Sequence, residues 1–402
     1  MMENETPLLN ETHVANMIDG HSRVFRAPGR VNLIGEHTDY NDGFVMPAAI
    51  DFSTWVTISP LDEHKLSIFS ENFGEHVEFD LNESSPAPRK HWSDYVVGVA
   101  VVLERAGYRL RGAKLRIRGE VPLGSGLSSS AAIEVATACA LAANSDLTIH
   151  RTELVKLCRR AENEFVGARV GIMDQFVSCY GQAKRALLLD CRSLEFELLP
   201  LSENASLVVC NTMVKHELAS GAYNERRAQC EAGVKHLAAV LPNVSALRDV
   251  SLEQLKEYGQ DLPDVIYRRC LHVISENTRV LEAGKALKQG DLDSFGHLMN
   301  ESHRSLREDY EVSCPELDLM VELARRVSGV YGARMTGGGF GGYTVNLVAV
   351  EHVEQFKRTV AEGYEKAMKL LPEIYVCDVA NGAEEVISQA RSGKRIMGGS
   401  EE

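Results

Sequence analysis

The chain has 402 residues, of which 44% are hydrophobic and 25% are charged, and this composition excludes a collagen-like, coiled-coil or globally disordered protein. Its formal net charge of −14 argues against a general nucleic-acid or anionic-membrane surface and favours a small partner. No apolar run approaches the roughly 18 residues of a membrane span. The first 20 residues lack the basic and apolar regions of a secretory signal peptide.

Nine cysteines are scattered along the chain without a C-x-x-C pair. This pattern is typical of free thiols in a reducing compartment, so we expect a cytoplasmic protein.

Short apolar runs alternate with helical patterns up to about residue 190. The runs at 55–58, 115–117 and 186–189 predict strands, and those at 128–143 and 154–165 predict helices. Further on, a helical pattern spans 265–288 and ends at Gly290, which suits a C-terminal cap. A strand at 343–350, a helix over 353–364 and a strand at 374–379 then suggest a crossover unit. We therefore predict an α+β fold with two domains, 1–190 and 191–402.

A glycine loop precedes a serine-rich helix start in the segment 121–132. Gly124 and Gly126 let the backbone approach a ligand, and serines 128–130 open a helix whose free N–H groups suit a phosphate. The lysine of a Walker A loop is absent. Charge on a triphosphate would therefore be met by the helix end, by Mg²⁺ and by side chains elsewhere. The alternative is an ordinary serine-capped helix after a turn.

A second polar segment follows the apolar run at 31–34, where Glu36, His37 and Asp39 come in quick succession. Carboxylates beside an imidazole suit the hydroxyl groups of a sugar, because each carboxylate accepts two or more hydrogen bonds. A solvated turn and a metal site are equally compatible with this spacing.

Two further features stand out. Five glycines occupy six positions at 337–342, directly before a predicted strand, which suggests a ligand-facing turn or close packing between domains.

Asp174 is the only charged residue between Val170 and Ala183. A carboxylate with apolar neighbours is costly to bury without a cation or donor, so Asp174 is a candidate base or charge stabiliser, or else a helix-cap residue.

Together these segments resemble the galactokinase family of the GHMP small-molecule kinases. The resemblance rests on five motifs in family order, at 29–44, 123–131, 171–176, 301–318 and 335–342. It implies a ribosomal protein S5 domain 2-like N-terminal domain and a ferredoxin-like C-terminal domain. It also implies ATP-dependent phosphorylation of the anomeric 1-hydroxyl of α-D-galactose, with Mg²⁺, to give galactose 1-phosphate and ADP.

The resemblance also assigns residues. It makes Asp174 the catalytic aspartate and Arg30 the arginine that faces it, so these groups, far apart in the chain, are expected to meet at one sugar oxygen. The implied sugar-binding residues are Arg30, Glu36, His37, Asp39, Asp174 and Tyr223; the implied nucleotide-binding residues are Gly124, Gly126, Ser129, Ser130 and Trp92; and the implied Mg²⁺ ligands are Ser130 and Glu162. An ordinary solvated glutamate remains the alternative for Glu162, with Glu164 its nearest competitor as ligand.

Two other functions are compatible with the family. N-acetylgalactosamine kinase-like relatives vary after the Glu-His pair, whereas Thr38–Gly43 follows the galactokinase form. A galactose and ATP sensor without turnover would be altered in the serine-alanine stretch of the phosphate loop, which is intact here at 128–132. The sequence leaves the oligomeric state open, and a monomer is compatible with it.

Overall fold

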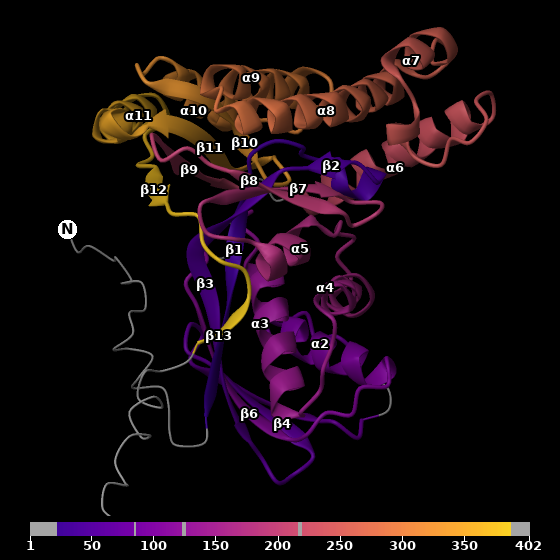
Figure 1. Ribbon diagram of the computed structural model, residues 1–402, viewed down its shortest axis with the longest axis vertical. Helices are drawn as coiled ribbons and strands as arrows, with labels where there is room; N and C mark the ends of the chain where they lie inside the picture. Colours follow the sequence, from indigo (N-terminus) through magenta and orange to yellow (C-terminus); the bar gives the residue numbers. More distant parts are fainter. Residues whose placement is uncertain (1–21, 84–85, 123–125, 216–218, 387–402) are drawn as a thin grey trace, which may run out of the picture.

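A computed structural model describes residues 22–83, 86–122, 126–215 and 219–386 (Figure 1). The first part of the chain contributes five strands to a six-stranded sheet, with helices packed against it. The sheet order is β13-β1-β3-β6-β4-β5, with β1 at Arg23–Asn32, β3 at Pro47–Pro60, β4 at Lys65–Ser70, β5 at Glu75–Asp80, β6 at Ala113–Gly119 and β13 at Glu384–Val386. The helices are α2 (Asp94–Arg105), α3 (Ser129–Asn144), α4 (Arg151–Arg160) and α5 (Met173–Tyr180).

Small side chains explain the position of α3 against this sheet. The helix is rich in alanine, and its buried face packs on β1 and β3. Because alanine keeps the helix axis close to the sheet, the N-terminus of α3 lies beside the end of β1, where the Arg30 amide donates to the Leu127 carbonyl at 3.0 Å.

The second part of the chain is built on a four-stranded antiparallel sheet with the order β10-β11-β9-β12. Its strands are β9 (Ala205–Lys215), β10 (Val330–Thr336), β11 (Gly341–Ala349) and β12 (Glu373–Cys377), and α10 (Pro315–Arg325) and α11 (Val353–Met368) pack against it. Four helices come between β9 and α10: α6 (Ala219–Ala238), α7 (Leu252–Tyr258), α8 (Asp264–Gln289) and α9 (Leu292–Glu308). The strand order confirms the predicted ferredoxin-like domain.

A three-stranded sheet, β2-β7-β8, lies between these parts (Figure 1). It contains β2 (Phe44–Val45), β7 (Arg185–Asp190) and β8 (Phe196–Pro200), and α8 packs against β2 and β8. The helical region of the second part thereby contacts the segment that follows Glu36, His37 and Asp39.

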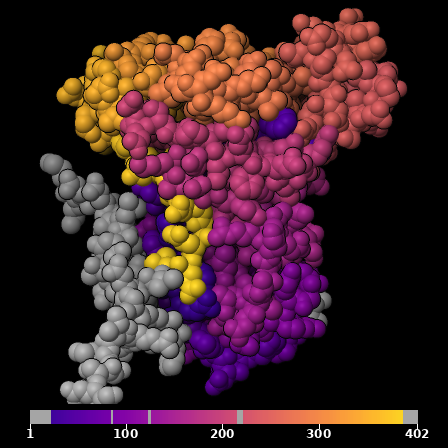
Figure 2. Space-filling view, viewed as in Figure 1, coloured from indigo at the N-terminus to yellow at the C-terminus, as the bar shows by residue number. Residues whose placement is uncertain are grey.

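The end of the described chain returns to the first sheet, where β13 pairs antiparallel with β1. Figure 2 shows this segment in yellow as it descends from the upper part over the lower one. Backbone hydrogen bonds join it to β3 and to the end of α5 along the way, including Ala380 to Ala49 at 3.0 Å and Gly382 to Gly181 at 2.7 Å. The division at residue 190 remains a prediction, and the first sheet includes a strand from beyond it.

The predicted elements agree with those observed, with one difference in local geometry. The helix predicted from residue 265 is α8, which ends at Gly290 in the left-handed conformation, with φ 70°. The pattern at 154–165 forms α4 only as far as Arg160, and residues Ala161–Val166 continue it as a π-helical turn. Among the residues that the structure describes, no helix is long and apolar enough to cross a membrane.

Candidate active site

Arg30 and Asp174 form a paired centre where β1 meets α5. Arg30 Nε donates to Asp174 Oδ1 at 2.8 Å, and Nη2 donates to Oδ2 at 2.7 Å. The Arg30 side chain is 6% exposed and that of Asp174 22% exposed. Asp174 also lies in the first turn of α5, where the helix dipole favours a carboxylate. The two groups therefore lie together as expected, and their meeting at one sugar oxygen stays a prediction.

The phosphate-loop candidate adjoins this pair. The Arg30 Nη1 group donates to the Gly126 carbonyl oxygen, and the Ser128 hydroxyl donates to Asp174 Oδ2. Ser128 adopts a left-handed conformation, φ 63°, and α3 begins at the next residue. The residue that precedes α3 therefore contacts Asp174 directly. Gly124 lies outside the described residues.

A pocket of about 430 Å³, here called the larger pocket, opens on one side of the pair. Its polar wall contains Gly126, Ser129 and Ser130 from the loop and the start of α3, and its apolar wall includes Trp92. The Trp92 ring stacks on Phe73 with a centroid distance of 5.7 Å and an interplanar angle of 12°. A helix N-terminus facing an aromatic wall suits a ligand that has phosphates at one end and a flat ring at the other.

A second pocket of about 150 Å³, the smaller pocket, lies on the other side. It contains all six predicted sugar-binding residues, Arg30, Glu36, His37, Asp39, Asp174 and Tyr223. Arg30 and Asp174 line both pockets. The two pockets therefore adjoin at the one paired centre.

The third glycine segment forms part of the smaller pocket through Gly337 and Gly338. The Gly337 amide donates to Glu36 Oε1 at 2.7 Å, and the Thr336 hydroxyl donates to the same oxygen at 3.1 Å. Glu36 thus connects the polar segment 36–39 to the loop between β10 and β11 through hydrogen bonds. The segment packs against the first part of the chain through Glu36 and also lines the smaller pocket, and its role as a ligand-facing turn stays a prediction.

His37 contributes a neutral imidazole to the smaller pocket. Burial is the main cause that lowers the pKa of His37 to about 3, so the ring is uncharged at neutral pH. Its Nδ1 atom lies 2.8 Å from the Tyr40 hydroxyl, and the Tyr223 ring lies 5.6 Å away between centroids. A neutral imidazole beside aromatic rings can exchange hydrogen bonds with sugar hydroxyls at little desolvation cost.

Asp39 lies in the short η1 helix, Asp39–Asn41, that follows the His37 turn. Burial, followed by the negative charge of Asp174, raises the pKa of Asp39 to about 7. Gly171 lies against this carboxylate, because a Cβ built on Gly171 would be only 1.7 Å from Asp39 Oδ2. Only glycine at position 171 leaves room for Asp39 in this position.

Glu162 lies in the π-helical turn after α4 and is 5% exposed. Its Oε2 atom accepts a hydrogen bond from Gln175 Nε2 at 2.6 Å. Burial and the Asp174 charge raise the pKa of Glu162 to about 7, while a hydrogen bond from Ser130 opposes the shift. Glu164 points away, with an exposed side chain paired to Arg160. The solvated alternative is therefore wrong for Glu162, and Ser130 and Glu162 are neighbours.

Sequence reasoning missed Glu134, which is fully buried in α3. Its Oε2 atom accepts from the same Gln175 Nε2 group at 3.0 Å, so the Gln175 amide bridges Glu134 and Glu162. Burial raises the pKa of Glu134 well above its usual range. The sequence does single out this residue, because Glu134 is the only charged residue between Leu127 and Asn144.

Family models match three parts of the chain. Residues 94–182 match the GHMP kinases N terminal domain, residues 15–60 match the galactokinase galactose-binding signature, and residues 284–366 match the GHMP kinases C terminal domain. The first two ranges contain all the predicted site residues except Trp92 and Tyr223.

Curated relatives and solved structures agree with this match. The galactokinase of Roseiflexus sp. is 45% identical, covering 92% of this chain and 94% of its own, and that of Haemophilus influenzae is 45% identical, covering 89% and 93%. A crystal structure of Lactococcus lactis galactokinase with galactose is 38% identical, covers 94% of this chain and 98% of its own, and has a TM-score of 0.89. A mevalonate kinase from Methanococcus jannaschii, 19% identical with TM-score 0.65, shares the fold. The chain therefore belongs to the galactokinase family of GHMP kinases.

Proposed function

We propose that the smaller pocket binds galactose, that the larger pocket binds ATP, and that phosphate passes between them at the Arg30–Asp174 pair. The protein phosphorylates the anomeric 1-hydroxyl of α-D-galactose with ATP, giving galactose 1-phosphate and ADP. The observation that carries the site assignment is that Arg30 and Asp174 line both pockets. A transfer reaction needs such a shared wall, because the attacking oxygen and the phosphorus must come within about 3–3.5 Å.

Asp174 orients the 1-hydroxyl of galactose and accepts its proton as the sugar oxygen forms its bond to the γ-phosphorus. The bond from that phosphorus to the bridging β-oxygen breaks, and ADP leaves with the electron pair. Arg30 orients Asp174 through two hydrogen bonds and stabilises charge on the transferred group. Positioning and charge stabilisation dominate such a reaction, because its loose transition state requires little covalent help.

Ser130 and Glu162 would hold Mg²⁺ at the edge of the larger pocket. The donor set fits, because magnesium takes oxygen ligands and often uses one or two protein side chains together with phosphates. Glu162 is a buried carboxylate that accepts hydrogen bonds from two neutral side chains, Ser130 and Gln175, so a cation would offset its desolvation. Among the described residues no group of three or more His, Cys, Asp or Glu side chains could hold a metal ion. When bound, Mg²⁺ neutralises charge on the β- and γ-phosphates.

A cytoplasmic location is part of this proposal. All nine cysteines are free thiols, and eight of them are buried, which suits a reducing compartment.

A substrate panel tests the function. ADP formation is measured with galactose, N-acetylgalactosamine and glucose, with and without a chelator that removes Mg²⁺. We expect turnover with galactose, which stops on chelation and returns when Mg²⁺ is added. A preference for N-acetylgalactosamine, or galactose binding without ADP formation, would contradict the proposal.

We predict that Trp92 contributes to ATP binding and not to galactose binding. Replacing it with leucine (Trp92→Leu) removes the stacked ring of the larger pocket, and we expect the KM for ATP to rise roughly 10-fold, since one base–aromatic stack contributes about 1–3 kcal/mol. The KM for galactose should change less than twofold. Trp55→Phe is the control, because Trp55 lies outside both pockets. Equal changes in both KM values would show that Trp92 has only a structural role.

Galactose affinity should depend on pH through Asp39. Its pKa of about 7 lies above the ordinary value of 3.8, so lowering the pH through 7 adds a proton and removes an acceptor for sugar hydroxyls. Calorimetry without ATP should show the galactose Kd rising toward tenfold per pH unit below pH 7 and levelling off above it. The Asp39→Asn variant should bind weakly and show no such dependence. A wild-type Kd that is flat between pH 5.5 and 8.5 would disprove this role.

A further inference from the structure

The turn that carries Asp39 is held from outside the smaller pocket. Asp42 ends the η1 helix in a left-handed conformation, φ 57°, which is uncommon for residues other than glycine although aspartate adopts it more readily than most. Its backbone carbonyl accepts a hydrogen bond from Arg248 Nη1 at 2.7 Å. Arg248 belongs to η3 (Leu247–Asp249), a single 3-10 turn that lies between the α-helices α6 and α7. A residue some 200 positions away thus contacts the turn beside the sugar pocket.

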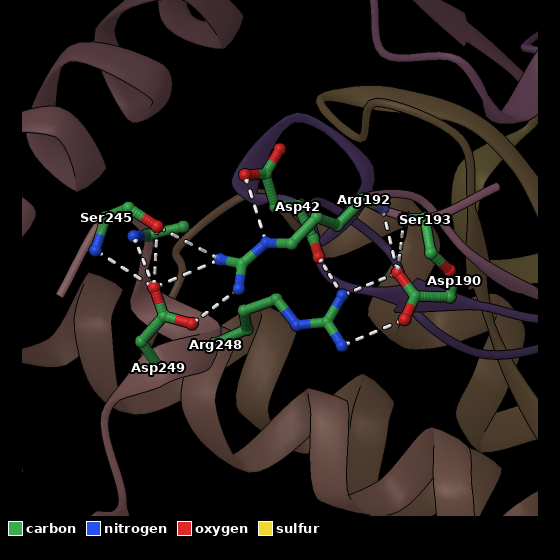
Figure 3. Close-up of polar contacts among 8 residues, drawn as sticks. Asp42, Asp190, Arg192, Ser193, Ser245, Arg248 and Asp249 are labelled. Carbon is green, nitrogen blue, oxygen red and sulfur yellow. Dashed lines mark hydrogen bonds and ion pairs between the residues drawn. The ribbon is translucent and has the colours of Figure 1, made fainter. Parts of the chain in front are cut away.

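The Arg248 guanidinium is fixed in place by two neighbours. It forms a bidentate pair with Asp190, with Nη1–Oδ1 at 2.6 Å and Nη2–Oδ2 at 3.0 Å (Figure 3). It also lies over the Phe44 ring, 4.3 Å from the centroid. Asp190 is paired across the sheet with Phe44. Arg248 therefore contacts both ends of the Asp42–Phe44 segment and is itself held rigidly.

A second arginine in the same network has a different target. Arg192 binds Asp249 through Nη1 at 2.6 Å and Nη2 at 3.0 Å (Figure 3). It approaches the turn only through the Asp42 side chain, at 3.5 Å. Its side chain is 38% exposed, against 15% for Arg248. The two arginines carry the same charge in one network, but only Arg248 donates to the backbone of the turn.

We propose that Arg248 is a positioning residue for galactose, which it supports by holding the Asp39–Asp42 turn so that Asp39 faces the sugar. The inference rests on the proposed role of Asp39. Neither Arg248 nor Asp190 lines either pocket, so the effect acts through the backbone. Because an unpaired carbonyl and a left-handed aspartate favour rearrangement of the turn, loss of Arg248 should affect galactose and leave the ATP side unchanged.

The test compares Arg248→Met with Arg192→Met, which remove the same charge and keep a similar apolar stem. Arg248→Met should raise the KM and the calorimetric Kd for galactose about 10-fold, with the KM for ATP changed less than twofold. Arg192→Met should leave galactose affinity within twofold. Arg248→Lys, which keeps one donor for the Asp42 carbonyl, should recover part of the loss.

Each other outcome counts against the inference. Equal losses in both methionine variants would point to net charge, and a parallel rise in both KM values with a lower Tm would point to general destabilisation. Asp39→Asn separates this inference from the one on which it rests. If Asp39→Asn weakens galactose binding and Arg248→Met does not, the positioning role fails alone. If Asp39→Asn binds galactose normally, the sugar-site assignment itself fails.

Discussion

Replacement of Asp174 by asparagine is expected to lower kcat by about 100-fold or more, the usual cost of removing a well-placed general base. Asparagine has nearly the same shape, but it lacks the negative charge that pairs with Arg30 and a second acceptor oxygen for the guanidinium. The sugar hydroxyl would then have no group to accept its proton. We expect both substrates still to bind, because the other residues that line the two pockets remain.

The measurement is steady-state ADP formation at saturating galactose and ATP, with Tm and circular dichroism to verify the fold. Asp146→Asn is the matched control, because Asp146 is exposed and paired with Arg111, and neither residue lines either pocket. A kcat for Asp174→Asn within a few-fold of wild type, at unchanged Tm, would show that this carboxylate does not act in the reaction.

The second large effect is expected from Gly171→Ala. The added methyl would lie 1.7 Å from Asp39 Oδ2 in the present arrangement, so the Asp39 carboxylate must move out of its position. A hydrogen bond to a charged group contributes about 1.5–3 kcal/mol, so galactose affinity should fall roughly 10- to 100-fold. The KM for ATP should stay within twofold, since Gly171 lines only the smaller pocket.

Gly221→Ala is the control for this change, because Gly221 lies in α6 with no atom within 4 Å of an added Cβ. It should bind both substrates normally. If Gly171→Ala also binds galactose with wild-type affinity, then Asp39 either moves without cost or does not contact the sugar.

Asp174 could be singled out from the sequence because it is an exception to its surroundings, whereas Arg30 was assigned by the family resemblance. Asp174 is a lone charge in an apolar helix, and Arg30 follows a glycine and precedes an apolar run. Buried charges need partners, and the five motifs in family order indicated which partner. The glycine loop and the helix after it were predictable for a similar reason, since both have strong local signals.

Other parts of the site depend on contacts that local patterns do not encode. Periodicity places Glu162 beside the apolar face of a helix, but the π-helical turn at 161–166 changes the register and buries its side chain. Likewise, nothing local to Gly171 reveals that Asp39, 132 positions earlier, fills the space where a Cβ would be. Such tertiary contacts appear only when the chain is folded.

The pairing of β13 with β1 has a consequence for biosynthesis. The edge partner of β1, together with Glu384 and Glu385, which pair with Arg26 and Arg23, is synthesised 358 to 362 residues after the arginines that it contacts. Until then, β1 is an unprotected sheet edge on a nascent chain, open to wrong pairing. A product truncated before Glu384 would therefore leave the edge of β1 at Val24–Arg26 without its partner strand.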